Sequence, residues 1–268
     1  MVEPVTSIGM AAVAAYLGRD AVQKLLGPTA DYLGHGLRDF TEKRADTIVK
    51  IFKRAESRLG DRIESPGVVP PKVLKGILVE GSFCDDNLAV EYLGGILASS
   101  RTGDGRDDRG ARILKTVDGM STYQLRTHYL MYGTIHTLFA GRDLPFDPDG
   151  RSKMQVFAPF SGYLGAMDLS ASERDQLPTL LPHIFYGLHG DEMLGPGWLY
   201  GVKEKVSERF AGATEGGVIF GPSSLGIELF LWAFGHSEKP HAYLLSVEFS
   251  PIVEGLRASI VGARATRT

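Results

Sequence analysis

Residues 85–98, DDNLAVEYLGGILA, indicate that the chain is built mainly from helices. Their apolar residues recur at the three- and four-residue spacing of a helix that buries one side. The residues concerned are Leu88, Tyr92, Leu93, Ile96 and Leu97. Asp85 or Asp86 can accept hydrogen bonds from the first backbone N–H groups, which predicts the start of the helix. Gly94 and Gly95 each cost about 1 kcal/mol relative to alanine in a helix, so we expect another element to approach closely there.

Helical patterns continue on the N-terminal side of this stretch. Residues 29–59 alternate apolar and charged positions at helical spacing, which predicts one long amphipathic helix ending near Gly60. The linker 65–71, SPGVVPP, has three prolines and cannot continue that helix. Proline suits the first turn of a helix, so a further helix is expected to begin at Pro71.

Two helices are predicted between residues 113 and 139, after a charged stretch. Residues 99–112, SSRTGDGRDDRGAR, have three glycines and indicate a loop. A short helix is expected near 113–117. Ser121 and Gln124 form the Ser-x-x-Gln pair of a capping box, which predicts a strong helix over 122–139.

The second half of the chain predicts a mixture of strands and helices. We expect strands at 154–160, 217–220 and 241–249, and helices after the capping box Ser170/Glu173, over 201–210, from 222–224 onward and from Pro251. Pro178 and Pro182 predict that the helix after Ser170 is broken or restarted.

The predicted fold class is α+β and predominantly helical, with an N-terminal helical bundle followed by a small winged-helix-like α/β unit. We expect three segments: N-terminal helices at 1–64, a helical core at 70–141 and a mixed α+β unit at 150–268. The chain has 268 residues, 43% of them hydrophobic, and a formal net charge of −3. Thirty-three of the 268 residues are glycine, about 12% against a usual ~7%. The positions of several of them inside predicted helices favour tight packing or assembly over disorder.

Composition and the first residues bear on the compartment. No apolar run approaches the roughly 20 residues that span a bilayer, so no integral membrane span is expected. Residues 1–7 lack the Lys or Arg of a signal peptide, and the cytoplasm is the expected location. Residues 8–17 predict a small-residue helix, with membrane contact as the alternative. The single cysteine, Cys84, excludes an intramolecular disulfide and a multi-cysteine zinc site.

Templates for catalysis are missing from the sequence. The chain contains no G-x-S-x-G elbow, Walker loop or dinucleotide fingerprint. His128 and His136 lie eight residues apart, a rise of about 12 Å along a helix, too far to share one ion. We therefore expect no catalytic residue, no metal and no cofactor, and the sequence favours a non-enzymatic protein over an enzyme.

Three groups of residues are candidates for binding. The arginines and aspartates of the charged loop can clamp an anion such as a phosphate, or they can pair with each other in solvent; they are Arg101, Arg106, Asp107, Asp108, Arg109 and Arg112. Tyr123, Arg126 and His128 share a helix face rich in polar aromatic residues, which suits an interface or an internal contact. Lys50, Arg54 and Arg58 align at four-residue spacing, as in a nucleic-acid-binding face or an ordinary solvated one.

The order of these elements resembles the abortive-infection alpha (Abi-alpha) family of bacterial phage-defence-associated proteins. The resemblance spans residues 18–235. It depends on KLLGP at 24–28, PPKVL at 70–74, residues 85–98, ILKTVDGMS at 113–121 and VIFGPSSLGIELF at 218–230. The resemblance implies a role in phage defence, and it brings no catalytic residues with it.

The leading hypothesis is a non-enzymatic phage-defence protein of the abortive-infection type that acts through protein partners or self-assembly into an oligomer. One alternative is a winged-helix protein that binds nucleic acid through Lys50, Arg54 and Arg58. Another is a nucleotide or anion sensor that uses the charged loop 101–112.

Overall fold

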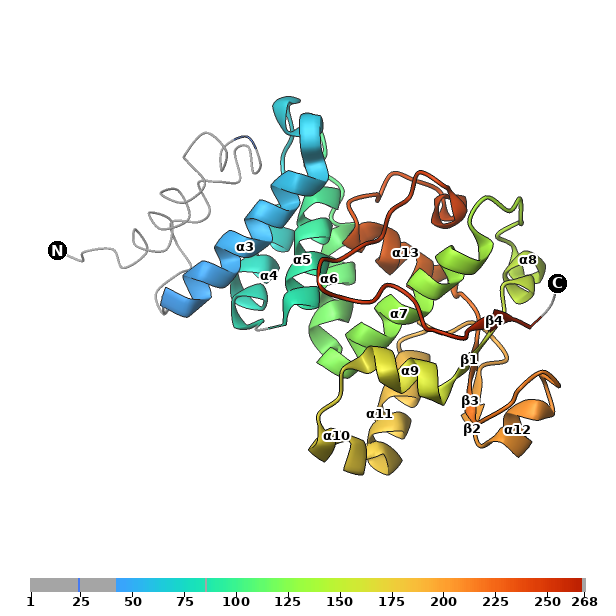
Figure 1. Cartoon of the computed structure of the whole chain (residues 1–268). Coiled ribbons are helices and arrows are strands. Elements are labelled where there is room, and N and C mark those ends of the chain that lie inside the picture. Colours follow the sequence, from blue (N-terminus) through green and yellow to red (C-terminus); the bar gives the residue numbers. More distant parts are fainter. Residues whose placement is uncertain (1–23, 25–41, 85, 267–268) are drawn as a thin grey trace. The chain divides into compact units, whose positions relative to one another are not determined.

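A computed structural model describes residues 24, 42–84 and 86–266 of the chain (Figure 1). These residues belong to two compact units. Unit 1 consists of the described residues up to Gly119 with Trp232–Glu238, and unit 2 consists of Met120–Leu231 with the described residues from Lys239 onward. Helix α7 (Thr122–Phe139) lies within unit 2, and residues 232–238 return to unit 1. The three segments expected at 1–64, 70–141 and 150–268 stay a prediction.

The regular elements in the described part of unit 1 are helices, and one isolated antiparallel bridge joins Val68 to Thr102. The helices are α3 (Glu42–Leu59), η2 (Gly60–Glu64), α4 (Pro71–Val79), η3 (Gly81–Phe83), α5 (Asn87–Ser99) and α6 (Arg109–Gly119). Helix α5 packs against α3, α4 and α6 (Figure 1). The start of α4 at Pro71 is confirmed, and α6 is longer than the helix predicted near 113–117. Of the long helix predicted over 29–59, residues 42–59 are helical; residues 29–41 and the apolar residues 8–17 lie outside the described part.

Helix α5 is the centre of unit 1. The carboxylate of Asp86 accepts a hydrogen bond from the backbone N–H of Ala89 at 3.0 Å, so Asp86, one of the two predicted candidates, is the N-cap. Every residue from 88 to 99 is buried. A Cβ atom on Gly94 would lie 2.5 Å from the Cβ of Arg54 on α3, and one on Gly95 would lie 1.8 Å from the carbonyl oxygen of Ala233. The glycines therefore permit the close approach that the sequence predicts.

Unit 2 combines helices with a small antiparallel sheet. Its elements are α7 (Thr122–Phe139), α8 (Pro148–Lys153), β1 (Val156–Pro159), α9 (Phe160–Met167), α10 (Ala171–Asp175), α11 (Leu177–Gly190), β2 (Leu199–Gly201), α12 (Lys203–Ser207), β3 (Gly217–Phe220), η4 (His241–Leu245) and β4 (Arg264–Ala265). Helix α13 (Ser224–Ala233) begins in unit 2, and its last two residues belong to unit 1. The predicted capping boxes at Ser121 and Ser170 are both formed.

The sheet has the order β2-β3-β1-β4, and all its neighbours are antiparallel. Val156 of β1 lies opposite Phe220 of β3, and Leu199 of β2 lies opposite Ile219 of β3. The two central strands are buried along their whole length. These strands confirm the predictions at 154–160 and 217–220, and the chain has the predicted class, α+β and predominantly helical. The winged-helix likeness stays a prediction.

Two predictions for the C-terminal region are wrong. Residues 241–249 do not form a strand; they begin with the 3₁₀ helix η4, in which Leu244 and Leu245 are buried in succession. The carbonyl groups of these two leucines are taken up by α7 and the turn after it: Nδ1 of His136 lies 2.8 Å from the oxygen of Leu244, and the N–H of Gly141 donates to the oxygen of Leu245 at 2.8 Å. No helix starts at Pro251 either. The side chains of α7 take up the backbone groups of this segment instead: the Tyr129 hydroxyl donates to the carbonyl of Pro251, and Thr134 Oγ1 accepts from the N–H of Ile260 at 2.9 Å.

The helix predicted over 201–210 is also wrong at both ends, because Gly201 ends strand β2 and α12 covers only five residues. The restart predicted at Pro178 is confirmed, since α10 ends before α11 begins there. Pro182, in contrast, lies inside a continuous α11. The later turns of α11 bury Ile184, Phe185 and Leu188, and this packing outweighs the backbone hydrogen bond that the proline removes.

No helix within the described residues is both long and apolar enough to cross a membrane.

Candidate functional site

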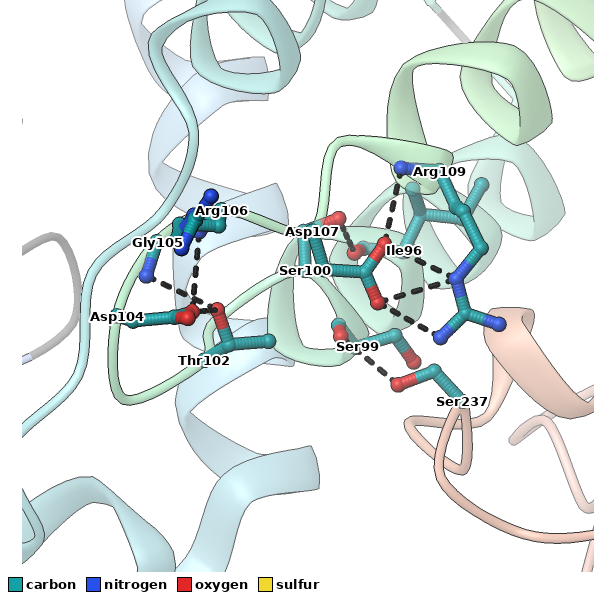
Figure 2. Close-up of polar contacts among 10 residues, drawn as sticks. All are labelled: Ile96, Ser99, Ser100, Thr102, Asp104, Gly105, Arg106, Asp107, Arg109 and Ser237. Carbon is teal, nitrogen blue, oxygen red and sulfur yellow. Dashed lines mark hydrogen bonds and ion pairs between the residues drawn. The ribbon is translucent and has the colours of Figure 1, made fainter.

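The charged loop before α6 is held by contacts among its own residues (Figure 2). The guanidinium of Arg109 binds the carboxylate of Asp107 with Nη2 at 2.6 Å and Nε at 2.9 Å. Asp107 also accepts a hydrogen bond from the backbone N–H of Arg109 at 3.1 Å, at the start of α6. These hydrogen bonds lower the pKa of Asp107. Asp107 and Arg109 therefore pair with each other, and this pairing gives no indication of an anion-binding site.

Arg101 binds backbone carbonyl groups. Its guanidinium donates to the carbonyl oxygens of Arg62 at 3.1 Å and Ile63 at 3.2 Å, and to that of Ser65. Burial, followed by the positive charge of Arg62, lowers the pKa of Arg101. The side chain therefore fastens the segment after α3 to the end of α5, which is a structural role.

The other three charged candidate residues do not converge on one point, and Arg112 lies within α6 rather than in the loop. Arg106 and Arg112 are exposed, and Asp108 forms a weak ion pair with Lys72 at 3.6 Å. Figure 2 shows a turn over residues 102–105, in which the hydroxyl of Thr102 accepts a hydrogen bond from the N–H of Gly105 at 3.1 Å. The structure thus favours the local pairing of the loop residues over a shared anion clamp.

Two of the three cations proposed to bind nucleic acid are engaged by a buried carboxylate. Glu91 of α5 is 3% exposed, and its oxygens accept from Arg54 Nε at 2.6 Å and from Arg58 Nη2 at 3.2 Å. The guanidinium of Arg58 also lies 4.6 Å from the ring centre of Phe234. Lys50 is exposed. Two of the three cations on this face of α3 therefore bind Glu91 on α5, and the face does not present three aligned cations to solvent.

The polar aromatic face of α7 is inside unit 2. His128 is fully buried, and its Nε2 lies 3.1 Å from the carbonyl oxygen of Gly226. Burial lowers the pKa of His128 to about 3, so the ring is neutral. Tyr123 is hydrogen-bonded to the carboxylate of Glu173, and Arg126 donates to the carbonyl of Ala166 at 3.0 Å. The internal contact that the sequence left open as an alternative is the one formed.

A different group of aromatic residues in unit 2 is exposed on α11 and half-buried at β2. We call it the aromatic patch: Tyr186 and His189 on α11, and Trp198 and Tyr200 at strand β2. The rings of Trp198 and Tyr200 are nearly parallel, at 11° with centroids 6.3 Å apart. Tyr186 meets the Trp198 ring edge-on at 5.5 Å, and His189 lies 5.2 Å from the same ring. Tyr186 is 62% exposed.

The strand geometry separates these rings from the core beneath the sheet, and the ring of Tyr200 stacks at 4.9 Å on buried Phe185 of α11. Leu199 of β2 packs against the buried cluster of Phe157, Val206, Ala213 and Ile219. Its neighbours Trp198 and Tyr200 lie on the opposite side of the strand, because successive side chains alternate. Val202, two residues further on, is 66% exposed. The predictions from sequence missed this patch, although the aromatic density of 185–200 and the alternation Trp198, Tyr200, Val202 were available as a signal.

Neither a search for metal ligands nor comparison with known proteins assigns a function to these residues. Among the described residues, no group of three or more His, Cys, Asp or Glu side chains is placed to hold a metal ion. No protein-family model, no curated protein and no solved structure matches the chain.

Proposed function

We propose that this is a phage-defence protein of the abortive-infection type that acts by binding a protein partner through the aromatic patch. The defence role comes from the sequence resemblance. The observation that carries the binding role is the exposure of Tyr186 beside the partly exposed rings of Trp198 and Tyr200. Tyrosine and tryptophan are enriched at the centre of protein interfaces, because they combine a large apolar area with a hydrogen-bonding tip.

A protein fits this patch better than a nucleic acid does. Binding of single-stranded nucleic acid by stacking combines open aromatic faces with a positively charged groove. The four patch residues include no Lys or Arg, and the chain has a net charge of −3. The ring of Trp198 already has Tyr186 against it edge-on and Tyr200 beside it. The partner in this proposal is another protein, which includes a second copy of the chain, and binding takes place in the cytoplasm.

The test compares phage plating on bacteria that express the wild-type protein or the variant Tyr186→Arg. A hot-spot side chain contributes about 2 kcal/mol or more to binding, which is roughly a 30-fold change in affinity. We expect wild-type expression to lower the plating of a susceptible phage, and Tyr186→Arg to restore it at least tenfold. Val247→Arg is the matched control, since Val247 is 78% exposed in the same unit and outside the patch.

Partner capture supplies the second readout. A photo-crosslinking amino acid at position 186 should yield one specific adduct, either with a cellular or phage protein or with a second copy, and Trp198→Ala should abolish it. The proposal fails if wild-type expression changes neither plating nor growth. It also fails if Tyr186→Arg, folded as judged by circular dichroism, protects as well as the wild type.

A further inference from the structure

A cavity of about 440 Å³ lies at one end of the sheet in unit 2. Gln155 precedes β1 and Gly197 lies just before β2, while Gly221 follows β3 and Thr266 follows β4. Because neighbouring strands are antiparallel, these four positions share one end of the sheet. The cavity is therefore built from turns that the sheet itself fixes.

Two arginines line this cavity, and no acidic residue does. Arg151 is on α8, and Arg209 follows α12. A guanidinium has five N–H donors. Arg209 uses Nη1 to bind the carbonyl of Gly197 at 2.8 Å, and Arg151 uses Nη1 to bind the carbonyl of Phe146. The rest of their side-chain donors have no hydrogen-bond or ion-pair partner among the described residues.

The cavity is also organised around one backbone carbonyl. The oxygen of Gly197 accepts from Arg209 and from the side-chain amide of Gln155 at 3.3 Å. Gly197 has a φ of +78°, a backbone conformation that residues other than glycine rarely adopt. The backbone carbonyl of Gln155 in turn accepts from the N–H of Thr266 at 2.9 Å. Arg209 and Gln155 are thus held in place at the cavity wall.

A second cavity, of about 400 Å³, lies at the opposite end of the sheet and provides a contrast. Arg257 and Arg264 line it, but so does Glu215. The carboxylate of Glu215 accepts hydrogen bonds from the hydroxyl of Ser161 at 2.6 Å and from its N–H at 3.1 Å. The acid offsets part of the positive charge there, whereas the charge of Arg151 and Arg209 is not offset by any lining residue.

We propose that the cavity of Arg151 and Arg209 binds a small phosphorylated molecule through its phosphate group. Two guanidinium forks match the several acceptor oxygens of a phosphate better than they match a single point charge. The volume falls in the range of small-molecule pockets, roughly 300–1,000 Å³. No aromatic residue lines the cavity, so the phosphate rather than a stacked base is the recognised group.

The test is isothermal titration of the full chain with pyrophosphate as the probe. We expect binding that weakens with added sodium chloride, and at least a tenfold loss of affinity in Arg209→Gln and in Arg151→Gln. Arg257→Gln is the matched control, because it removes an arginine from the opposite cavity, and it should bind as the wild type does. Arg209 is exposed, so its variant tests the site even if Arg151→Gln unfolds.

Three outcomes overturn the proposal: no binding of pyrophosphate at millimolar concentration, equal binding by wild type and Arg209→Gln, or an equal loss in Arg257→Gln, which would indicate general surface charge. Citrate in place of pyrophosphate separates phosphate recognition from recognition of carboxylates. Tighter binding of citrate would contradict the assignment to phosphate. The measurement is made on purified protein, so its failure is independent of the phage-plating test.

Discussion

Replacing Glu91 by glutamine should destabilise unit 1 strongly. Glu91 is buried, and it is shared by Arg54 and Arg58, whose side chains are 41% and 21% exposed. Glutamine keeps the shape and removes the charge, so both arginines lose their counter-charge, and the new amide N–H₂ group faces one of them. Breaking a fully buried pair costs about 3–5 kcal/mol. Water reaches both arginines, so we expect about 2–3 kcal/mol here.

The assay is urea unfolding at pH 7, followed by tryptophan fluorescence. The chain has two tryptophans, and Trp232 belongs to unit 1. A Trp198→Phe background therefore makes fluorescence report unit 1 alone. Thermal unfolding should show a decrease in Tm of roughly 6–12 °C.

The matched control is Glu56→Gln, since Glu56 is exposed on α3; we expect a change below about 0.5 kcal/mol. In a double-mutant cycle, Arg58→Gln should cost less in the Glu91→Gln background than in the wild type. The reasoning is refuted if Glu91→Gln lies within 0.5 kcal/mol of its background, because the buried carboxylate would then not be holding the arginines.

Three further predictions concern other parts of the chain. His128 has a pKa near 3 in the folded state and 6.5 when unfolded, so protonation favours unfolding. Stability should therefore fall as the pH drops below about 6.5, by about 2 kcal/mol between pH 7 and 5, and urea titrations of His128→Gln should lack that contribution. In α9, Gly162→Ala should destabilise the protein, since the new Cβ would lie 1.9 Å from the carbonyl oxygen of Val261. Gly165→Ala meets no atom within 4 Å and should stabilise the protein by about 0.5–1 kcal/mol. Thermal unfolding checks this, because the two variants should shift Tm in opposite directions. Arg101→Lys should speed hydrogen exchange at residues 62–65, because lysine cannot reproduce the fork that binds three carbonyls, while Arg112→Lys should leave that exchange unchanged.

Short-range signals in the sequence predicted the capped helix starts correctly. The cap at Asp86 and the capping boxes at Ser121 and Ser170 depend on hydrogen bonds across three residues, and all three are formed. Local patterns misjudged the C-terminal region. Residues 241–249 alternate like a strand, yet they begin with the 3₁₀ helix η4, and the carbonyl oxygen of Leu244 lies 2.8 Å from Nδ1 of His136 on α7.

The candidate sites were harder to predict, because the partner of a charged or aromatic side chain lies far away in sequence. Arg58 and Glu91 are 33 residues apart, and the sequence could not show that this carboxylate takes up the cations of α3. The same holds for Arg151 and Arg209, which meet in one cavity only because the antiparallel sheet brings their turns to the same end.

The sequence by itself thus determined the helical class, most helix starts and the close approaches at Gly94 and Gly95, because each depends on a few neighbouring residues and on the volume of one side chain. The tertiary structure alone decided which charges are paired and which face the cavity of Arg151 and Arg209. It also decided which aromatic rings are buried around His128 and which are exposed around Tyr186, because burial is a property of the packed chain and not of any short segment.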